Sequence, residues 1–223
     1  MQDRFQVYSP AQESILATNK MIKNTYLLLS ATVLFSAFAA VVSMRMQLNI
    51  SMLGVFLGYF GLLFLVQRTA SSAFGILSTF AFTGFLGLTL GPILNSYIQN
   101  FSNGSEIIAA SLGSTGIIFF ALSGYALSTK KDFSYLTGFL FIGMSVIIIA
   151  SIASIFFAIP ALYLAISAAS VMLMSGYILY ETSAMINGGQ NNYILATISI
   201  YLSLFNIFVN LLRIFGAVSG RRD

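Results

Sequence analysis

Cysteine, histidine and tryptophan are absent from the 223-residue sequence. Without cysteine and histidine the chain cannot form disulfides, the usual zinc sites or haem ligation, and it has no cysteine or histidine catalyst. Charged residues are also scarce, at 7 %, whereas a soluble domain carries roughly a quarter. A folded domain of this size needs more polar surface, so the composition excludes a soluble enzyme, a nucleic-acid-binding protein and a disordered chain.

Hydrophobic side chains, in contrast, make up 58 % of the residues. They gather in long apolar runs that show no two-residue period, which predicts transmembrane helices rather than barrel strands. The sequence therefore predicts an all-α integral membrane protein, a seven-transmembrane-helix bundle. The expected spans are residues 24–44, 50–66, 72–94, 106–128, 135–158, 161–186 and 193–218.

Polar segments divide the chain into three parts. Residues 1–23 form a polar N-terminal tail, residues 24–218 the transmembrane domain, and residues 219–223 a short C-terminal tail. Glycine and proline at Gly91-Pro92 are expected to mark the exit of the third span. A polar loop from Asn95 to Ser105 is expected to follow.

Lysine and arginine predict the orientation of the bundle, because positive charge gathers on the cytoplasmic side. The N-terminal side of seven spans would hold Arg4, Lys20, Lys23, Arg68, Lys130 and Lys131. The other side would hold Arg45, Arg221 and Arg222, with Arg213 inside the last span near that side. We therefore expect a cytoplasmic N-terminus and an external C-terminus. The external arginine pair conflicts with the rule, so a re-entrant sixth or seventh segment stays open as an alternative.

Two GxxxG motifs lie within the expected spans, one formed by Gly54 and Gly58 and the other by Gly87 and Gly91. Small residues at this spacing let helix backbones approach closely in lipid, where no hydrophobic force drives helices together. We interpret these glycines as helix-packing positions. A homo-oligomer seam is the alternative.

Polar side chains follow one face of the seventh span, at steps of three and four residues. A lipid-facing asparagine or arginine is costly, so this stripe must face protein or water. It either forms hydrogen bonds between helices or lines a hydrophilic cavity or ion path. Its members are Ser199, Ser203, Asn206, Asn210 and Arg213.

Glu181 is an acidic residue placed well inside an expected span, about one turn before the end of the sixth. Because low dielectric penalises its charged form, it is a candidate pH-sensing or ion-path residue. The alternative is a carboxylate that reaches the headgroups or pairs with Arg68, Lys130 or Lys131. No serine has a histidine or a pair of carboxylates as a base, so we expect no enzymatic activity.

Five short motifs follow one another in order, from about residue 20 to the end of the chain. They are Gly75–Leu94, Thr115–Phe119, Lys130–Leu136, Tyr180–Ser183 and Asn192–Gly216. Together they resemble the Bax inhibitor-1 (transmembrane Bax-inhibitor-motif) family, and within it the bacterial inner-membrane branch. The resemblance implies a multi-pass inner-membrane protein whose seventh helix lies near the centre of the bundle.

The resemblance also implies two functions. One is association with the FtsH membrane protease and restraint of its activity. The other is a pH-sensitive calcium leak governed by paired acids on spans six and seven. Glu181 matches the first acid, Ser203 replaces the second, and Arg68 resembles a basic residue at the start of span three.

The missing second carboxylate favours FtsH modulation over a calcium leak. Ca²⁺ takes six to eight oxygens, several of them charged, so Glu181 with serine and asparagine oxygens predicts only a weak site. We expect no other cofactor or metal. The partners we expect are the lipid bilayer and FtsH rather than nucleic acid, and modulation of FtsH is favoured over a cation leak.

Overall fold

The computed structural model describes residues 10–157 and 159–220 of the chain. Within these residues the chain forms seven α-helices and no strand, and each helix is long and apolar enough to cross a membrane. The predicted all-α, seven-helix fold is therefore confirmed. The helices are α1 (Pro10–Met46), α2 (Met52–Thr69), α3 (Phe74–Asn100), α4 (Gly104–Thr129), α5 (Leu136–Phe156), α6 (Pro160–Ile186) and α7 (Tyr193–Ser219).

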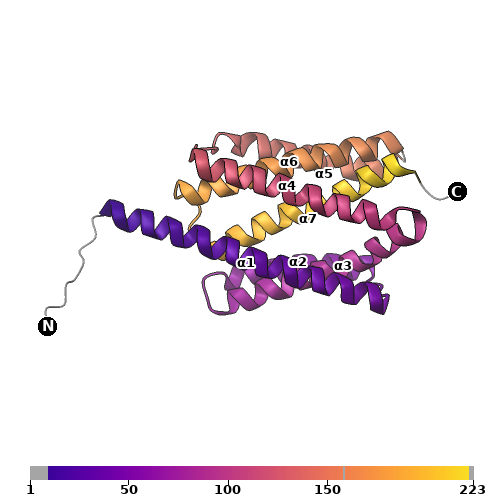
Figure 1. Cartoon of the computed structure of the whole chain (residues 1–223), viewed down its shortest axis with the longest axis horizontal. Coiled ribbons are helices and arrows are strands. Elements are labelled where there is room, and N and C mark those ends of the chain that lie inside the picture. Colours follow the sequence, from indigo (N-terminus) through magenta and orange to yellow (C-terminus); the bar gives the residue numbers. More distant parts are fainter. Residues whose placement is uncertain (1–9, 158, 221–223) are drawn as a thin grey trace.

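The helices run side by side, and α7 passes between α1–α3 on one side and α4–α6 on the other (Figure 1). It packs against α1, α3, α4 and α6, whereas α2 packs mainly on α3 and α5 mainly on α6. The expected central position of the seventh helix is confirmed. We call the end where α1 enters the N-terminal end of the bundle, and the end where α7 finishes the C-terminal end.

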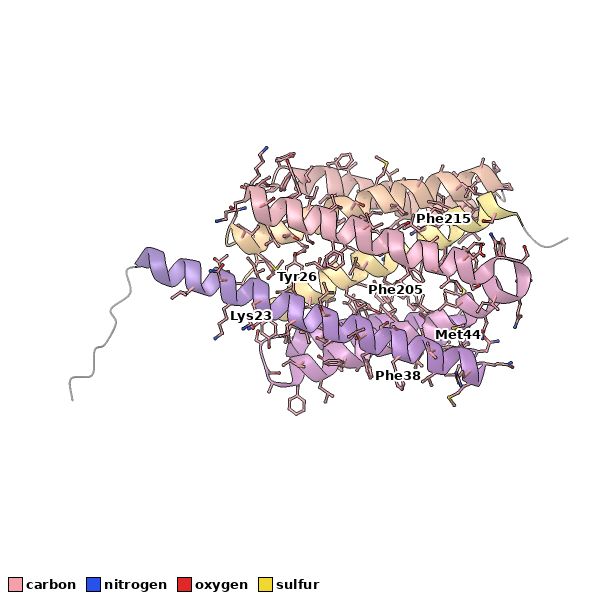
Figure 2. All side chains as sticks on the ribbon, viewed as in Figure 1. Lys23, Tyr26, Phe38, Met44, Phe205 and Phe215 are labelled. Atoms are coloured by element: carbon pink, nitrogen blue, oxygen red, sulfur yellow. The ribbon has the colours of Figure 1, made fainter. Side chains whose placement is uncertain are left out.

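Burial in this bundle does not follow apolarity. The window of highest mean hydropathy, 2.6, belongs to α5, which is nearly all exposed, whereas α7 is the most buried helix. Lipid solvates apolar side chains as well as a protein interior does, so purely apolar faces stay outside and hydroxyl-bearing faces pack together. Phe38, for example, points outward from α1 (Figure 2) and is 65 % exposed.

The predicted end of the third span at Gly91-Pro92 is wrong, because α3 continues through Pro92 to Asn100. Proline has no N–H to donate to the carbonyl four residues earlier, which here belongs to Leu88. The hydroxyl of Ser43 on α1 donates to this carbonyl instead, at 2.7 Å. The expected polar loop after Asn95 is therefore mostly helical.

The first helix also begins earlier than the apolar run at residue 24 suggested. It starts at Pro10 and projects beyond the other helices at the N-terminal end (Figure 1). Lys23 lies where α1 leaves the bundle (Figure 2). The part of the expected tail from residue 10 to residue 23 is thus helical, while residues 1–9 and 221–223 lie outside the described residues.

Candidate functional site

Glu181 lies on α6 at the N-terminal end of the bundle and faces α7. Its Oε1 accepts a hydrogen bond from the Ser199 hydroxyl at 2.7 Å. Its Oε2 is buried and has no hydrogen-bond partner among the described residues. One oxygen of the carboxylate is therefore held by α7, and the other keeps its capacity to accept a hydrogen bond.

The surroundings of Glu181 are tightly packed. Ile178 and Thr182 on the same helix are inaccessible to solvent, and Met185 is nearly so. Ser123, six residues before the end of α4, is the other described residue with a buried side-chain oxygen that lacks a partner. Buried polar groups without partners are uncommon in folded proteins. Both of these lie toward the N-terminal end of the bundle.

Ser203 lies one helical turn beyond Ser199 on α7 and is only 3 % exposed. Its hydroxyl donates to the backbone carbonyl of Ser199 at 3.0 Å, and Glu181 is not its partner. The direct partner of the carboxylate is therefore Ser199, which sequence reasoning placed in the stripe without singling it out. The signal was available, since Glu181 and Ser199 lie about equally far from the α6–α7 turn in an antiparallel hairpin.

The remaining members of the α7 stripe do not join α7 to another helix by hydrogen bonds. The side-chain amide of Asn206 donates to the Leu202 carbonyl at 2.9 Å, and that of Asn210 donates to the Asn206 carbonyl at 2.8 Å. Both bonds run back along α7 itself. Arg213 is exposed near the C-terminal end.

The basic residues named as partners of Glu181 point elsewhere. The guanidinium of Arg68 lies over the Phe64 ring, 5.0 Å from its centroid. Lys130 and Lys131 are exposed, and the Lys131 backbone carbonyl accepts a hydrogen bond from the Ser183 hydroxyl of α6. Glu181 is hydrogen-bonded to α7 rather than to any of these three side chains.

The four glycines of the GxxxG motifs have different surroundings. A Cβ at Gly87 would meet the backbone of Ser36 on α1, and one at Gly91 would meet Ser43. A Cβ at Gly58 would meet the Phe85 ring of α3, whereas Gly54 faces only Ile50 and Ser51 at the start of its own helix. The motif on α3 thus brings α3 and α1 into backbone contact.

A buried polar cluster that sequence reasoning missed ties three helices together. The Tyr201 hydroxyl on α7 donates to the Thr83 carbonyl of α3 at 3.2 Å and lies 2.6 Å from the Ser36 hydroxyl of α1. All three residues are at most 5 % exposed. The available signal was a tyrosine in the middle of a span, away from the membrane interfaces where tyrosines gather.

Seven membrane-length helices, a hydrogen-bonded central helix and a buried carboxylate at one end define a multi-pass α-helical membrane protein. A family model described as "Inhibitor of apoptosis-promoting Bax1" matches residues 18–220. The chain belongs to this family, which confirms the resemblance drawn from the motifs.

Bacterial relatives resemble the chain over nearly its whole length. The Escherichia coli K12 protein named "Modulator of FtsH protease YccA" is 48 % identical over 97 % of this chain and 99 % of its own. An uncharacterized Pseudomonas aeruginosa protein is 48 % identical over 90 % of both chains. A Vibrio cholerae membrane protein is 44 % identical over 93 % of this chain and 94 % of its own.

Proposed function

We propose that this chain is a non-enzymatic protein of the bacterial inner membrane that modulates the activity of an FtsH protease. The observation that carries the proposal is the match to the Escherichia coli modulator, which covers 97 % of this chain and 99 % of the relative. An inner-membrane location is supported by the name of a second Escherichia coli relative, "Inner membrane protein YccA", at the same identity.

The first turns of α1, which project from the bundle, are proposed to contact FtsH. In this segment Lys20 and Lys23 are exposed, and Leu16 is 52 % exposed. A polar helix that rises from the bundle is free to contact a second membrane protein close to the bilayer. With the N-terminus in the cytoplasm, as the lysine and arginine distribution predicts, this contact is made on the cytoplasmic side.

The test combines crosslinked co-purification from native membranes with degradation of an FtsH substrate in reconstituted vesicles. The full chain should co-purify with FtsH and slow degradation of the substrate. Deleting residues 1–18 should abolish both effects and lengthen the lifetime of the chain in cells, because the protease would lose the segment by which it holds the chain. The bundle should stay folded, since the described part of this segment projects beyond the other helices (Figure 1). Deletion of residues 221–223 is the matched control. Unchanged co-purification after the N-terminal deletion would contradict a role for this segment.

A cation leak is the second candidate, and the free buried Oε2 of Glu181 is the observation that favours it. The donor set around Glu181 does not suit tight Ca²⁺ binding, since one carboxylate and one hydroxyl fall far short of six to eight oxygens. The described residues contain no group of three acidic, histidine or cysteine side chains that could hold a metal. Any leak through this site is therefore proposed to proceed with weak ion binding.

A further inference from the structure

A cavity of about 930 Å³ with both polar and apolar walls lies at the C-terminal end of the bundle, on the far side from Glu181. The ends of α3, α5 and α7 and the start of α6 form its walls. Phe215 marks this end of α7 in Figure 2. Arg213 is the charged residue among the described lining residues, and none of them carries a carboxylate.

Three donor groups on the walls of this cavity have no hydrogen-bond partner among the described residues. They belong to Ser151 on α5, Ser167 on α6 and Arg213 on α7. Ser167 lines the cavity and is only 1 % exposed as a residue. A ligand that accepts hydrogen bonds can pair with these three donor groups.

Two neighbouring hydroxyls on the wall of the cavity already donate hydrogen bonds to backbone carbonyls. The Tyr163 hydroxyl donates to the Ser154 carbonyl at 2.7 Å, and the Ser154 hydroxyl donates to the Ser151 carbonyl at 2.7 Å. The first bond joins the start of α6 to the end of α5, and the second lies within α5. The free donors of Ser151 and Ser167 are therefore carried by helices that are bonded to each other.

The cavity also adjoins the lipid-facing surface. Tyr163 and Leu164 line it and are 46 % and 37 % exposed. At the end of α5, Ile155 and Phe156 do not line the cavity and are 74 % and 78 % exposed. A ligand in this position can place its polar part in the cavity and its hydrocarbon part against apolar side chains.

We propose that this cavity binds the phosphate-containing headgroup of an anionic phospholipid. Arg213 supplies the charge, since a guanidinium matches the geometry of phosphate oxygens. Ser151 and Ser167 supply neutral hydrogen bonds. A zwitterionic headgroup would bring an ammonium group next to Arg213, where none of the described lining residues offers a carboxylate, so the site discriminates in favour of a net negative headgroup.

The test is native mass spectrometry of the full-length protein in detergent with equal amounts of phosphatidylglycerol and phosphatidylcholine. The native chain should retain phosphatidylglycerol about tenfold over phosphatidylcholine, because Arg213 repels the choline ammonium; tenfold corresponds to about 1.4 kcal/mol. Arg213→Gln should reduce this preference to near one, and Ser167→Ala should lower the retention of both lipids while leaving the preference unchanged. Arg45→Gln is the matched control, because Arg45 is exposed in the last turn of α1 at the same end and does not line the cavity.

Three outcomes would overturn the proposal. The first is an undiminished preference in Arg213→Gln, with helical circular dichroism showing that the variant is folded. The second is an equal loss in Arg45→Gln, which would assign the preference to general surface charge. The third is displacement of the retained lipid by millimolar inorganic phosphate, which would make the cavity a site for a free anion.

Discussion

The hydroxyl of Ser43 replaces the backbone hydrogen bond that Pro92 removes from α3, and this substitution can be measured. Ser43 is inaccessible to solvent, and its hydroxyl lies 2.7 Å from the Leu88 carbonyl. Gly91 makes the approach feasible, since a Cβ there would collide with Ser43. Ser43→Ala would leave the Leu88 carbonyl without a donor inside the bundle.

We expect Ser43→Ala to lower the free energy of unfolding by about 1.5 kcal/mol, near the upper end of measured hydrogen-bond contributions inside membranes. In a Pro92→Ala background the new N–H of residue 92 donates to Leu88, as in an ordinary helix. The same serine substitution should then lower the free energy by only about 0.5 kcal/mol. The difference, about 1 kcal/mol, is the coupling between the two positions.

The assay is reversible unfolding by sodium dodecyl sulfate in mixed micelles, followed by far-ultraviolet circular dichroism. Ser145→Ala is the matched control, because its hydroxyl donates to the Phe141 carbonyl within α5 and no proline is involved. A coupling energy indistinguishable from zero would refute the argument, since the serine would then stabilise the bundle independently of Pro92.

Three further predictions concern topology, packing and the carboxylate site. Reporter fusions should place the N-terminus in the cytoplasm and the C-terminus outside; two cytoplasmic ends would show that a span is re-entrant. Tyr201→Phe should lower the free energy of unfolding by about 1 kcal/mol, because it removes the hydroxyl that joins α7 to the Thr83 carbonyl and to Ser36. An unchanged midpoint in the same micelle assay would argue against the three-helix cluster. Ser203→Asp should confer pH-dependent Ca²⁺ flux in liposomes by placing a second acid one turn from Ser199, and Glu181→Gln should abolish the gain. A folded Ser203→Asp variant that behaves like the parent at every pH would remove the residue-level support for a leak.

Hydropathy alone was sufficient to predict the class of fold and the number of helices. Each span must satisfy its own backbone hydrogen bonds in lipid, so an apolar run that is long enough to cross the bilayer forms an α-helix. The family could also be recognised from short motifs in order, and the match to residues 18–220 confirms it. The placement of Glu181 inside α6 likewise followed from its position in an apolar run.

Hydropathy did not identify the hydrogen-bond partners that join different helices. Hydropathy does not say which face of one helix meets which face of another, so Ser199 was not recognised as the partner of Glu181. The continuation of α3 past Pro92 was missed for the same reason, because the compensating donor, Ser43, comes from α1. The cavity around Arg213 is built from three separate parts of the sequence, which are the end of α3, the α5–α6 connection with its flanking turns, and the end of α7.

The sequence by itself thus determined what crosses the membrane, because that depends on local apolar length and on backbone hydrogen bonds within each helix. Only the tertiary structure decided which polar groups meet. Lipid and protein interiors are equally apolar, so the arrangement of helices depends on close backbone contacts such as Gly87 against Ser36 and on a few hydrogen bonds between helices. Those contacts join residues far apart along the chain, and they form only when the whole bundle is assembled.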